Sequence, residues 1–252
     1  MSGTGSKEDG RGRLGAMVSG LAVAVGCVLF LGGFAWAAVV YQPYTIPTDS
    51  MAPTMNPGDR VLAERIDGAD VRRGDVVVFT DEVWAATPMV KRVVGTGGDE
   101  VACCDKDGRL TVNGTPVDEP YVEQDPTAAG GKAAPASPQE FSATVPKGKI
   151  FLLGDERATS LDSRVHLQEA GQGSVPLSAV QARVDAVAWP MNGMIDRPSS
   201  FAALPGGVSA AGPLPLQLGA ILVGVVLILG GAAYGPVAAR LGRRKAPAGG
   251  AR

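Results

Sequence analysis

The sequence predicts a mostly β fold, in which an antiparallel β-sheet domain lies outside a membrane between an N-terminal and a C-terminal transmembrane helix. Two long segments without charged residues bracket the middle of the chain. The middle consists of short, valine-rich apolar runs separated by turn residues, which is typical of strands. Between residues 41 and 198 no long segment has the period of about 3.6 residues that predicts a helix. The 252 residues are enough for one or two domains with a real core.

The N-terminal elements are a short cytoplasmic tail and a membrane anchor. Residues 1–15 carry three basic and two acidic residues, and residues 16–40 carry no charge. Because a spanning helix needs about 20 apolar residues, the second segment is long enough to cross a bilayer. The sequence AWA at residues 35–37 also fits the cleavage site of a signal peptide. The apolar run before it exceeds the usual core of about 7–15 residues, which favours an uncleaved anchor.

The middle of the chain, residues 41–198, is expected to form the domain outside the membrane. Gly-Asp pairs border its apolar runs four times, and this pair is favourable turn chemistry because glycine adopts positive φ and aspartate binds nearby backbone amides. Residues 125–140 have almost no large apolar side chain and are predicted to form a mobile surface loop. The strand-length runs are RVLAERI, DVVVF, PMVKRVVG, EVACC, RLTVNG, KIFLLG and VQARVDAVAWP.

The C-terminal elements are a linker over residues 199–213, a second transmembrane helix over 214–235 and a cytoplasmic tail over 236–252. The tail contains five basic residues and no acidic one. Because basic residues mark the cytoplasmic ends of spanning helices, both termini are expected in the cytoplasm and the middle outside. This topology predicts a multi-pass protein of the plasma membrane. A buried core helix is the alternative for the second apolar segment.

Charge and cysteine content narrow the function classes. Residues 41–215 carry 15 basic and 23 acidic residues, a net charge of −8, which argues against nucleic-acid binding because that needs a basic face. Cys27 lies within the first apolar segment, whereas Cys103 and Cys104 are neighbours outside, where a disulfide is possible but not implied. With one histidine and no CxxC spacing, a metal site is not expected.

A serine held between prolines directly follows the first anchor. The segment YTIPTDSMAPTMNPGDRV places Ser50 between Pro47 and Pro53. A serine nucleophile needs a base, which can be histidine, here His166 alone, or a lysine whose pKa is lowered by burial. Lys91 in PMVKRVVG fits the second requirement, because strand alternation puts it on one face with apolar neighbours. A solvent-facing lysine on an edge strand is the alternative.

Four sequence blocks together resemble those of one family. SMAPTMNPGDRV resembles S-M-x-P-T-L-x-x-G-D-x-V, RRGDVVVF resembles G-D-x-V-x-F, KRVVGTGGDEV resembles K-R-x-x-G-x-x-G-D-x-V, and GDERATSLDSR resembles G-D-N-R-x-x-S-x-D-S-R. In this order they are similar to the bacterial type I signal peptidases, the leader peptidase family of membrane-anchored serine proteases with a Ser-Lys dyad. The resemblance covers residues 46–164.

The resemblance implies a role for each matching residue. Ser50 matches the nucleophile and Lys91 the general base. Thr48 matches the position whose hydroxyl joins the Ser50 backbone N–H in an oxyanion hole, and Ser160 matches a serine that orients the lysine. The other matches are a charged scaffold, Arg92, Asp162 and Arg164, and positions that line the substrate groove, Ile46, Pro47 and Val90.

Some residues depart from the family pattern. Glu156 stands where the family usually has asparagine, and Leu167 stands where a glycine often closes the last block. Both positions lie away from Ser50 and Lys91. The two differences are therefore expected to affect the local turn geometry more than catalysis. The C-terminal membrane helix is not general in the family. The resemblance also implies that about residues 102–141 correspond to the variable insertion of the family.

The implied function is removal of signal peptides from exported preproteins through an acyl-enzyme, without metal or organic cofactor. The implied partners are these preproteins, the lipid bilayer and nearby protein export machinery. Two alternatives remain. One is a self-cleaving Ser-Lys protease of the repressor type, and the predicted membrane anchors argue against it. The other is a catalytically inactive relative that acts as a membrane-bound accessory or peptide-binding subunit.

Overall fold

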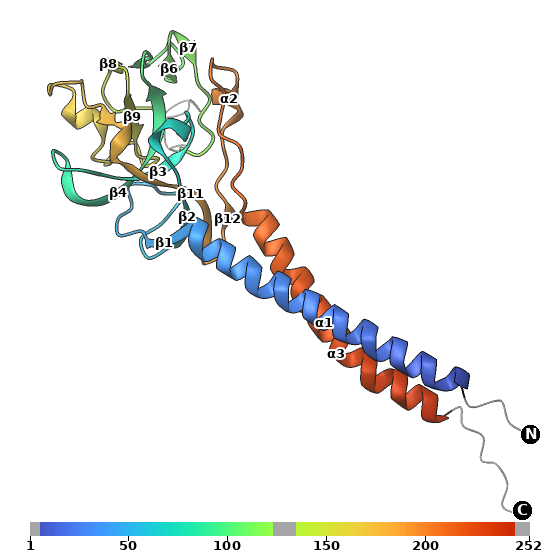
Figure 1. The fold of residues 1–252 in the computed structure, drawn as a ribbon. Helices are drawn as coiled ribbons and strands as arrows, with labels where there is room; N and C mark the ends of the chain where they lie inside the picture. Colours follow the sequence, from blue (N-terminus) through green and yellow to red (C-terminus); the bar gives the residue numbers. More distant parts are fainter. Residues whose placement is uncertain (1–5, 123–134, 245–252) are drawn as a thin grey trace, which may run out of the picture. The chain divides into compact units, whose positions relative to one another are not determined.

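The computed structural model describes residues 6–122 and 135–244. The described residues divide into a helical unit, residues 6–39 and 213–244, and a β unit, residues 40–122 and 135–212. Figure 1 shows the elements of both.

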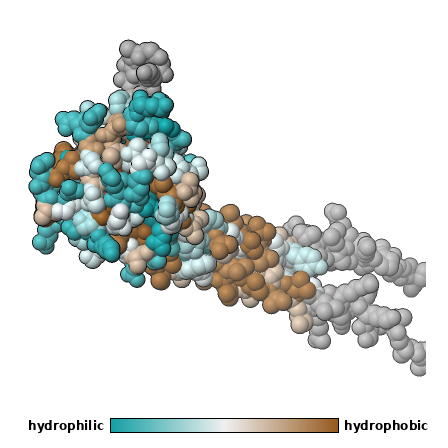
Figure 2. All heavy atoms as spheres, turned by 90° about the horizontal axis from the view of Figure 1, so that it is seen from above, coloured by the Kyte–Doolittle hydropathy of each residue, from teal (hydrophilic) through white to brown (hydrophobic). Residues whose placement is uncertain are grey.

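The helical unit consists of α1 (Ser6–Val40) and α3 (Leu214–Arg244). Each contains a segment, Gly15–Val40 and Leu214–Gly235, that is long and apolar enough to cross a membrane, with mean hydropathy 2.3. Few side chains of these segments are buried, and the helices present a hydrophobic surface (Figure 2). A free apolar surface of this size is what a lipid bilayer would cover.

Glycines let the two helices pack closely against each other. A Cβ atom on Gly26 would lie 2.8 Å from the Ile228 side chain, and one on Gly224 would lie 2.7 Å from the Phe30 backbone nitrogen. The Ser19 hydroxyl also donates a 2.6 Å hydrogen bond to a carbonyl of the facing helix. Small residues at such contacts are the usual means by which membrane helices associate.

The β unit is built around an eight-stranded antiparallel sheet in the order β1-β2-β11-β3-β4-β9-β10, with β12 paired to β11 (Figure 1). The expectation of a mostly antiparallel β domain between two apolar helices is confirmed. The strands of this sheet are β1 (Tyr41–Thr45), β2 (Arg60–Arg65), β3 (Val76–Asp81), β4 (Ala85–Thr96), β9 (Lys149–Leu153), β10 (Val175–Pro176), β11 (Val180–Trp189) and β12 (Gly193–Met194).

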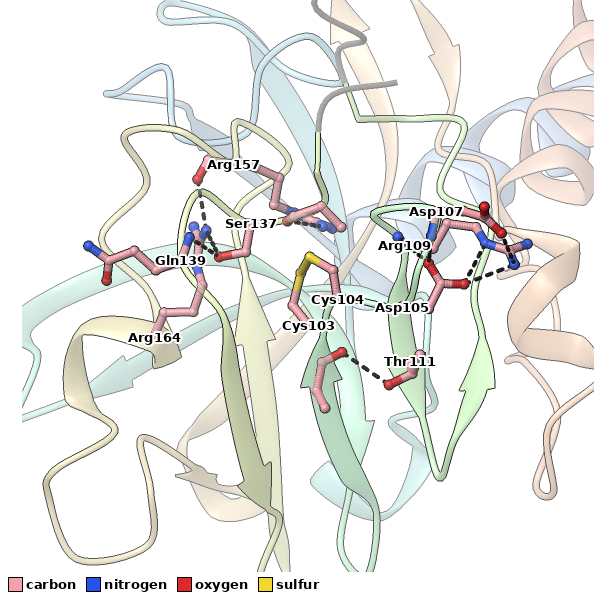
Figure 3. Close-up of a disulfide and its surroundings, with 12 residues drawn as sticks. Cys103, Cys104, Asp105, Asp107, Arg109, Thr111, Ser137, Gln139, Arg157 and Arg164 are labelled. Atoms are coloured by element: carbon pink, nitrogen blue, oxygen red, sulfur yellow. Dashed lines mark hydrogen bonds and ion pairs between the residues drawn. A yellow bond between two sulfur atoms is a disulfide. The ribbon is translucent and has the colours of Figure 1, made fainter. Parts of the chain in front are cut away.

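The expected insertion supplies β6, β7 and part of β5 to a second, four-stranded sheet in the order β7-β6-β5-β8. Its strands are β5 (Glu100–Cys103), β6 (Leu110–Val112), β7 (Thr115–Pro116) and β8 (Phe141–Thr144). Cys103 and Cys104 form a disulfide at the end of β5, beside the segment that carries Ser137 (Figure 3). Of the predicted mobile loop, residues 125–134 lie outside the described residues, whereas Ala136 and Ser137 are buried.

Both faces of β3 are covered, which explains why its sequence is a continuous apolar run. Val76 and Val78 belong to one core cluster, together with Met51 and Val184. Val77, Phe79 and their neighbours belong to another on the opposite face. In a strand that is buried on both faces, polar and apolar residues need not alternate. The strand in DVVVF is therefore a continuous run of apolar residues.

The short helices are η1 (Gly68–Asp70), η2 (Ser163–His166), η3 (Leu177–Ala179) and α2 (Ser199–Ala202). The last lies in the segment expected as a linker, and that segment packs onto the β unit. Phe201 is fully buried, and the Ser209 hydroxyl donates a 2.6 Å hydrogen bond to Asp75. Residues 199–212 therefore form part of the folded domain rather than a free connection.

Candidate active site

Ser50 lies in the loop that joins β1 to β2, and buried neighbours fix this loop. Ile46 exchanges backbone hydrogen bonds with Asp59 and Gly58 across its base. Met51 and Met55 insert into the core, with 1% and 0% of their surface exposed. Ser50 itself remains partly exposed. The loop therefore presents a hydroxyl to solvent from a backbone that is anchored on both sides.

Lys91 reaches this hydroxyl from the middle of β4. Its side chain is 5% exposed, so the alternative of a solvent-facing lysine is wrong. The Lys91 ammonium donates a 2.8 Å hydrogen bond to Ser50 Oγ and a 3.2 Å bond to the Val90 carbonyl. Burial lowers the pKa of Lys91, and the charges of Asp162 and Asp155 act in the opposite direction. A buried lysine with a lowered pKa, in contact with a serine hydroxyl, is suited to accept its proton.

Thr48 lies on the same side of the loop as Ser50. Its hydroxyl donates a 3.2 Å hydrogen bond to Ser50 Oγ, and its side chain is exposed. Two hydrogen-bonding groups, Thr48 Oγ1 and Lys91 Nζ, therefore converge on the Ser50 hydroxyl oxygen.

Ser160 lies close to Ser50, but its side chain does not make the hydrogen bond to Lys91 that the resemblance implies. Its buried hydroxyl has no hydrogen-bond partner among the described residues, and Lys91 binds the Val90 carbonyl instead. A Cβ atom placed on Gly154 would lie 2.1 Å from Ser160 Oγ and 2.4 Å from the Ser50 carbonyl oxygen. Gly154 thus lets the chain after β9 pass against both serines, and a hydrogen bond from Ser160 to the lysine stays a prediction.

The residues expected to form a charged scaffold take part in two ion pairs. Arg92 donates hydrogen bonds of 2.8 and 2.7 Å to Asp155, and these side chains are 1% and 0% exposed. Arg164 donates two 2.8 Å bonds to Asp162, which also accepts a 3.0 Å bond from the Gly154 amide. Such bidentate, buried pairs fix the orientation of the segments that carry them.

Sequence reasoning missed Asp155 as part of this scaffold. Asp155 also accepts a 2.6 Å hydrogen bond from Thr54, in the loop that carries Ser50. It therefore ties that loop to the arginine next to Lys91. Its Gly-Asp pair had been interpreted only as turn chemistry, although it begins the block GDERATSLDSR.

The expected groove residues differ in exposure. Ile46 is 2% exposed and belongs to the core, Pro47 is exposed, and Val90 is half-buried. Strand β9 pairs with β4 only from Arg92 to Thr96. Within the described residues, the edge of β4 from residue 85 to residue 91 has no strand partner on that side. This edge leads directly to the lysine.

His166 lies in η2 and has other partners. Its ring stacks on Trp84 with centroids 4.6 Å apart, and its Nδ1 lies 2.7 Å from the Glu169 carboxylate. The groups in contact with Ser50 Oγ are those of Lys91 and Thr48. The geometry therefore favours the lysine over the histidine as the base.

The chain resembles proteins of one known family. The chain is similar to signal peptidase I of Mycobacterium tuberculosis, with 30% identity over 60% of this chain and 66% of that protein. It is also similar to signal peptidase I of Bacillus caldolyticus, with 34% identity over 60% of this chain and 81% of that protein. The chain thus spans just under two thirds of the mycobacterial relative.

A crystal structure of a signal peptidase I from Enterococcus faecalis matches with 28% identity and a TM-score of 0.35, over 44% of this chain and 94% of that chain. The family model described as signal peptidase, peptidase S26, matches residues 17–189, which is more than half of the sequence. Because the family model covers this much of the sequence, the chain belongs to the signal peptidase family, peptidase S26.

Proposed function

We propose that this protein is a membrane-anchored serine endopeptidase that removes signal peptides from exported preproteins by means of a Ser50–Lys91 dyad. The observation that carries the proposal is the 2.8 Å contact between Ser50 Oγ and a lysine that is 5% exposed. Burial disfavours the charged ammonium, and a neutral amine is the form that can act as a base.

The reaction begins with neutral Lys91, which accepts the Ser50 proton as the oxygen attacks the carbonyl carbon of the scissile bond. The tetrahedral intermediate collapses when Lys91 returns that proton to the leaving amine, and an ester to Ser50 remains. Lys91 then takes a proton from water, whose oxygen attacks the ester. Collapse of this second intermediate returns the proton to Ser50 and releases the acid.

The oxyanion of each intermediate needs hydrogen-bond donors. The Ser50 backbone N–H is one candidate and the Thr48 hydroxyl is the other. Support comes from the 3.2 Å hydrogen bond between Thr48 and Ser50 Oγ, which keeps this donor beside the reacting oxygen. A β-branched side chain restricts χ1, so little freedom is lost when the donor is used.

The substrate is proposed to add as a strand along the free edge of β4. Residues 85–91 offer unpaired backbone groups on that side, and an extended peptide there would run toward Lys91. The half-buried side chain of Val90 and the exposed ring of Pro47 would contact it. Shallow apolar contacts of this kind would accept small side chains and give an A-x-A preference.

Both helices of the helical unit are proposed to span the plasma membrane, with the termini in the cytoplasm. The support is their apolar length and the basic residues that flank them. Protease added to intact protoplasts should digest the β unit and spare tags on either terminus. Loss of a C-terminal tag would contradict a second span.

The decisive experiment is cleavage of a preprotein by the full-length chain in detergent. Wild type and His166→Ala should cleave it, whereas Ser50→Ala and Lys91→Ala should not. Binding without cleavage by the wild type would support the alternative of an inactive, peptide-binding relative. Loss of cleavage in a folded His166→Ala variant would instead favour a Ser-His mechanism.

A further inference from the structure

We define the clasp as the two residues Glu119 and Tyr121. Both lie in the segment that follows β7, and this segment contacts the residues that support Ser50. Val117, at its start, is 1% exposed and belongs to a core cluster that also contains Phe151 of β9. The clasp is therefore anchored on the β unit by apolar packing, although it lies in a part of the chain expected to vary.

Glu119 forms a buried ion pair with Arg157. Arg157 donates hydrogen bonds of 2.7 and 2.6 Å to the two carboxylate oxygens, and the side chains are 4% and 5% exposed. Figure 3 shows Arg157 beside the segment that carries Ser137, and its guanidinium donates a further 3.0 Å bond to the Ala136 carbonyl. Removal of either side chain would leave the other charge without a counter-charge. Because both charges are buried away from water, this loss would be destabilising.

Arg157 transmits this contact to the nucleophile. Its Nε donates a 2.9 Å hydrogen bond to the Gly154 carbonyl, and Gly154 lies against the Ser50 carbonyl. The Glu156 amide donates a 3.2 Å bond to the same Ser50 carbonyl. The loop of residues 154–160 thus touches the Ser50 backbone at two points, and Arg157 lies between the loop and the clasp.

Tyr121 makes the second connection, to the arginine next to the lysine. The Arg92 guanidinium carbon lies 3.8 Å from the centre of the Tyr121 ring, and the tyrosine hydroxyl donates a 2.5 Å hydrogen bond to Glu119. The Tyr121 ring covers one face of the Arg92 guanidinium, which also forms the ion pair with Asp155. A ring at this distance attracts the cation and keeps water from its ion pair.

We propose that Glu119 and Tyr121 are positioning residues, which hold the loop of residues 154–160 and Arg92 in the places that align Ser50 with Lys91. Neither touches the reacting atoms, so they act through Arg157 and Arg92. The effect on rate rests on the proposed function, whereas the effect on the loop does not. A misplacement of about 1 Å at a reacting group costs on the order of a hundredfold in rate, so this support is expected to matter for turnover.

The test uses the full-length chain in detergent and compares Glu119→Gln and Tyr121→Leu with the control Asp118→Asn. Asp118 is the neighbouring carboxylate, 79% exposed, with one 3.4 Å contact to Arg109. For both clasp variants we expect kcat to fall about tenfold or more while KM stays within about twofold, since the binding edge is untouched. The control should keep both constants within about twofold.

A double variant separates positioning from general damage. If Glu119 acts through Arg157, Glu119→Gln combined with Arg157→Gln should be no slower than Arg157→Gln alone. Losses that multiply would overturn the proposal, as would folded clasp variants with wild-type kcat. If Glu119→Gln does not fold, Tyr121→Leu, at a partly exposed position, decides the question.

Hydrogen exchange provides a measurement that needs no activity. Amides of residues 154–160 should exchange about tenfold faster or more in Glu119→Gln, with no change in Asp118→Asn or in the amides of β3. Unchanged exchange in this loop would overturn the proposal. If the wild type fails to cleave any preprotein, the proposed function is wrong. The hydrogen-exchange result then tests by itself whether Glu119 positions the loop of residues 154–160.

Discussion

A single methyl group at Gly154 is expected to disable the active site. Alanine there would place its Cβ 2.4 Å from the Ser50 carbonyl oxygen and 2.1 Å from Ser160 Oγ. Ordinary contacts begin near 3.4 Å, so the Ser50 backbone and this loop must separate by about 1 Å. The Ser160 side chain can rotate, but the Ser50 carbonyl belongs to a loop anchored by the buried Met51 and Met55.

The size of the effect follows from this displacement. Moving a nucleophile by about 1 Å costs on the order of 10² in rate, and the substrate edge of β4 is not involved. We therefore expect Gly154→Ala to lower kcat about a hundredfold with little change in KM. The assay is steady-state cleavage of a preprotein, together with a thermal melt that confirms folding at the assay temperature.

Two further variants make this prediction sharp. Gly148→Ala is the matched control, because Gly148 has φ +74° and nothing within 4 Å of its Cβ position. It should cost stability of about 1 kcal/mol through backbone strain and leave kcat unchanged. Adding Ser160→Ala to Gly154→Ala should not restore activity, since the contact with the Ser50 carbonyl remains. A folded Gly154→Ala variant that cleaves within about threefold of the wild-type rate would refute the reasoning.

Three other predictions concern the dyad and its support. The rate should fall on the acid side of the Lys91 pKa, which burial lowers, because only the neutral amine accepts a proton; a rate that is flat down to about pH 5 would exclude lysine as the base. Thr48→Val keeps the shape but deletes the hydroxyl, so kcat should drop by about 10²–10³ with little change in KM, whereas Thr48→Ser should retain most activity; a folded valine variant within about threefold of wild type contradicts the oxyanion role. Arg92→Met leaves the Asp155 carboxylate buried without its cation, so the free energy of unfolding should fall by about 3–5 kcal/mol. Arg109→Met, at an ion pair whose arginine is 39% exposed, should lower it by only about 0–1 kcal/mol. Denaturant unfolding measures both values.

Local signals in the sequence predicted much of the fold. Three Gly-Asp pairs form the expected turns, with positive φ at Gly58, Gly74 and Gly98. In each turn the aspartate accepts a hydrogen bond from the backbone N–H three residues before it. The fourth pair is different, since Gly154 lacks a positive φ and is required for its close approach to two serines. The same dipeptide therefore serves two purposes, and its sequence alone does not distinguish them.

The sequence by itself determined the two apolar segments, the antiparallel β class and the pairing of Ser50 with Lys91 as candidates. These depend on length, on alternation and on blocks of adjacent residues, all of which can be seen along the chain. The tertiary structure alone decided that Cys103 bonds to Cys104, that residues 199–212 dock through Phe201, and that the Ser160 hydroxyl lies buried with no hydrogen-bond partner among the described residues. It also brought Glu119 to Arg157, 38 residues along the chain. Such contacts depend on which surfaces the folded chain buries together, and a local pattern does not encode the partner of a buried charge that lies this far along the chain.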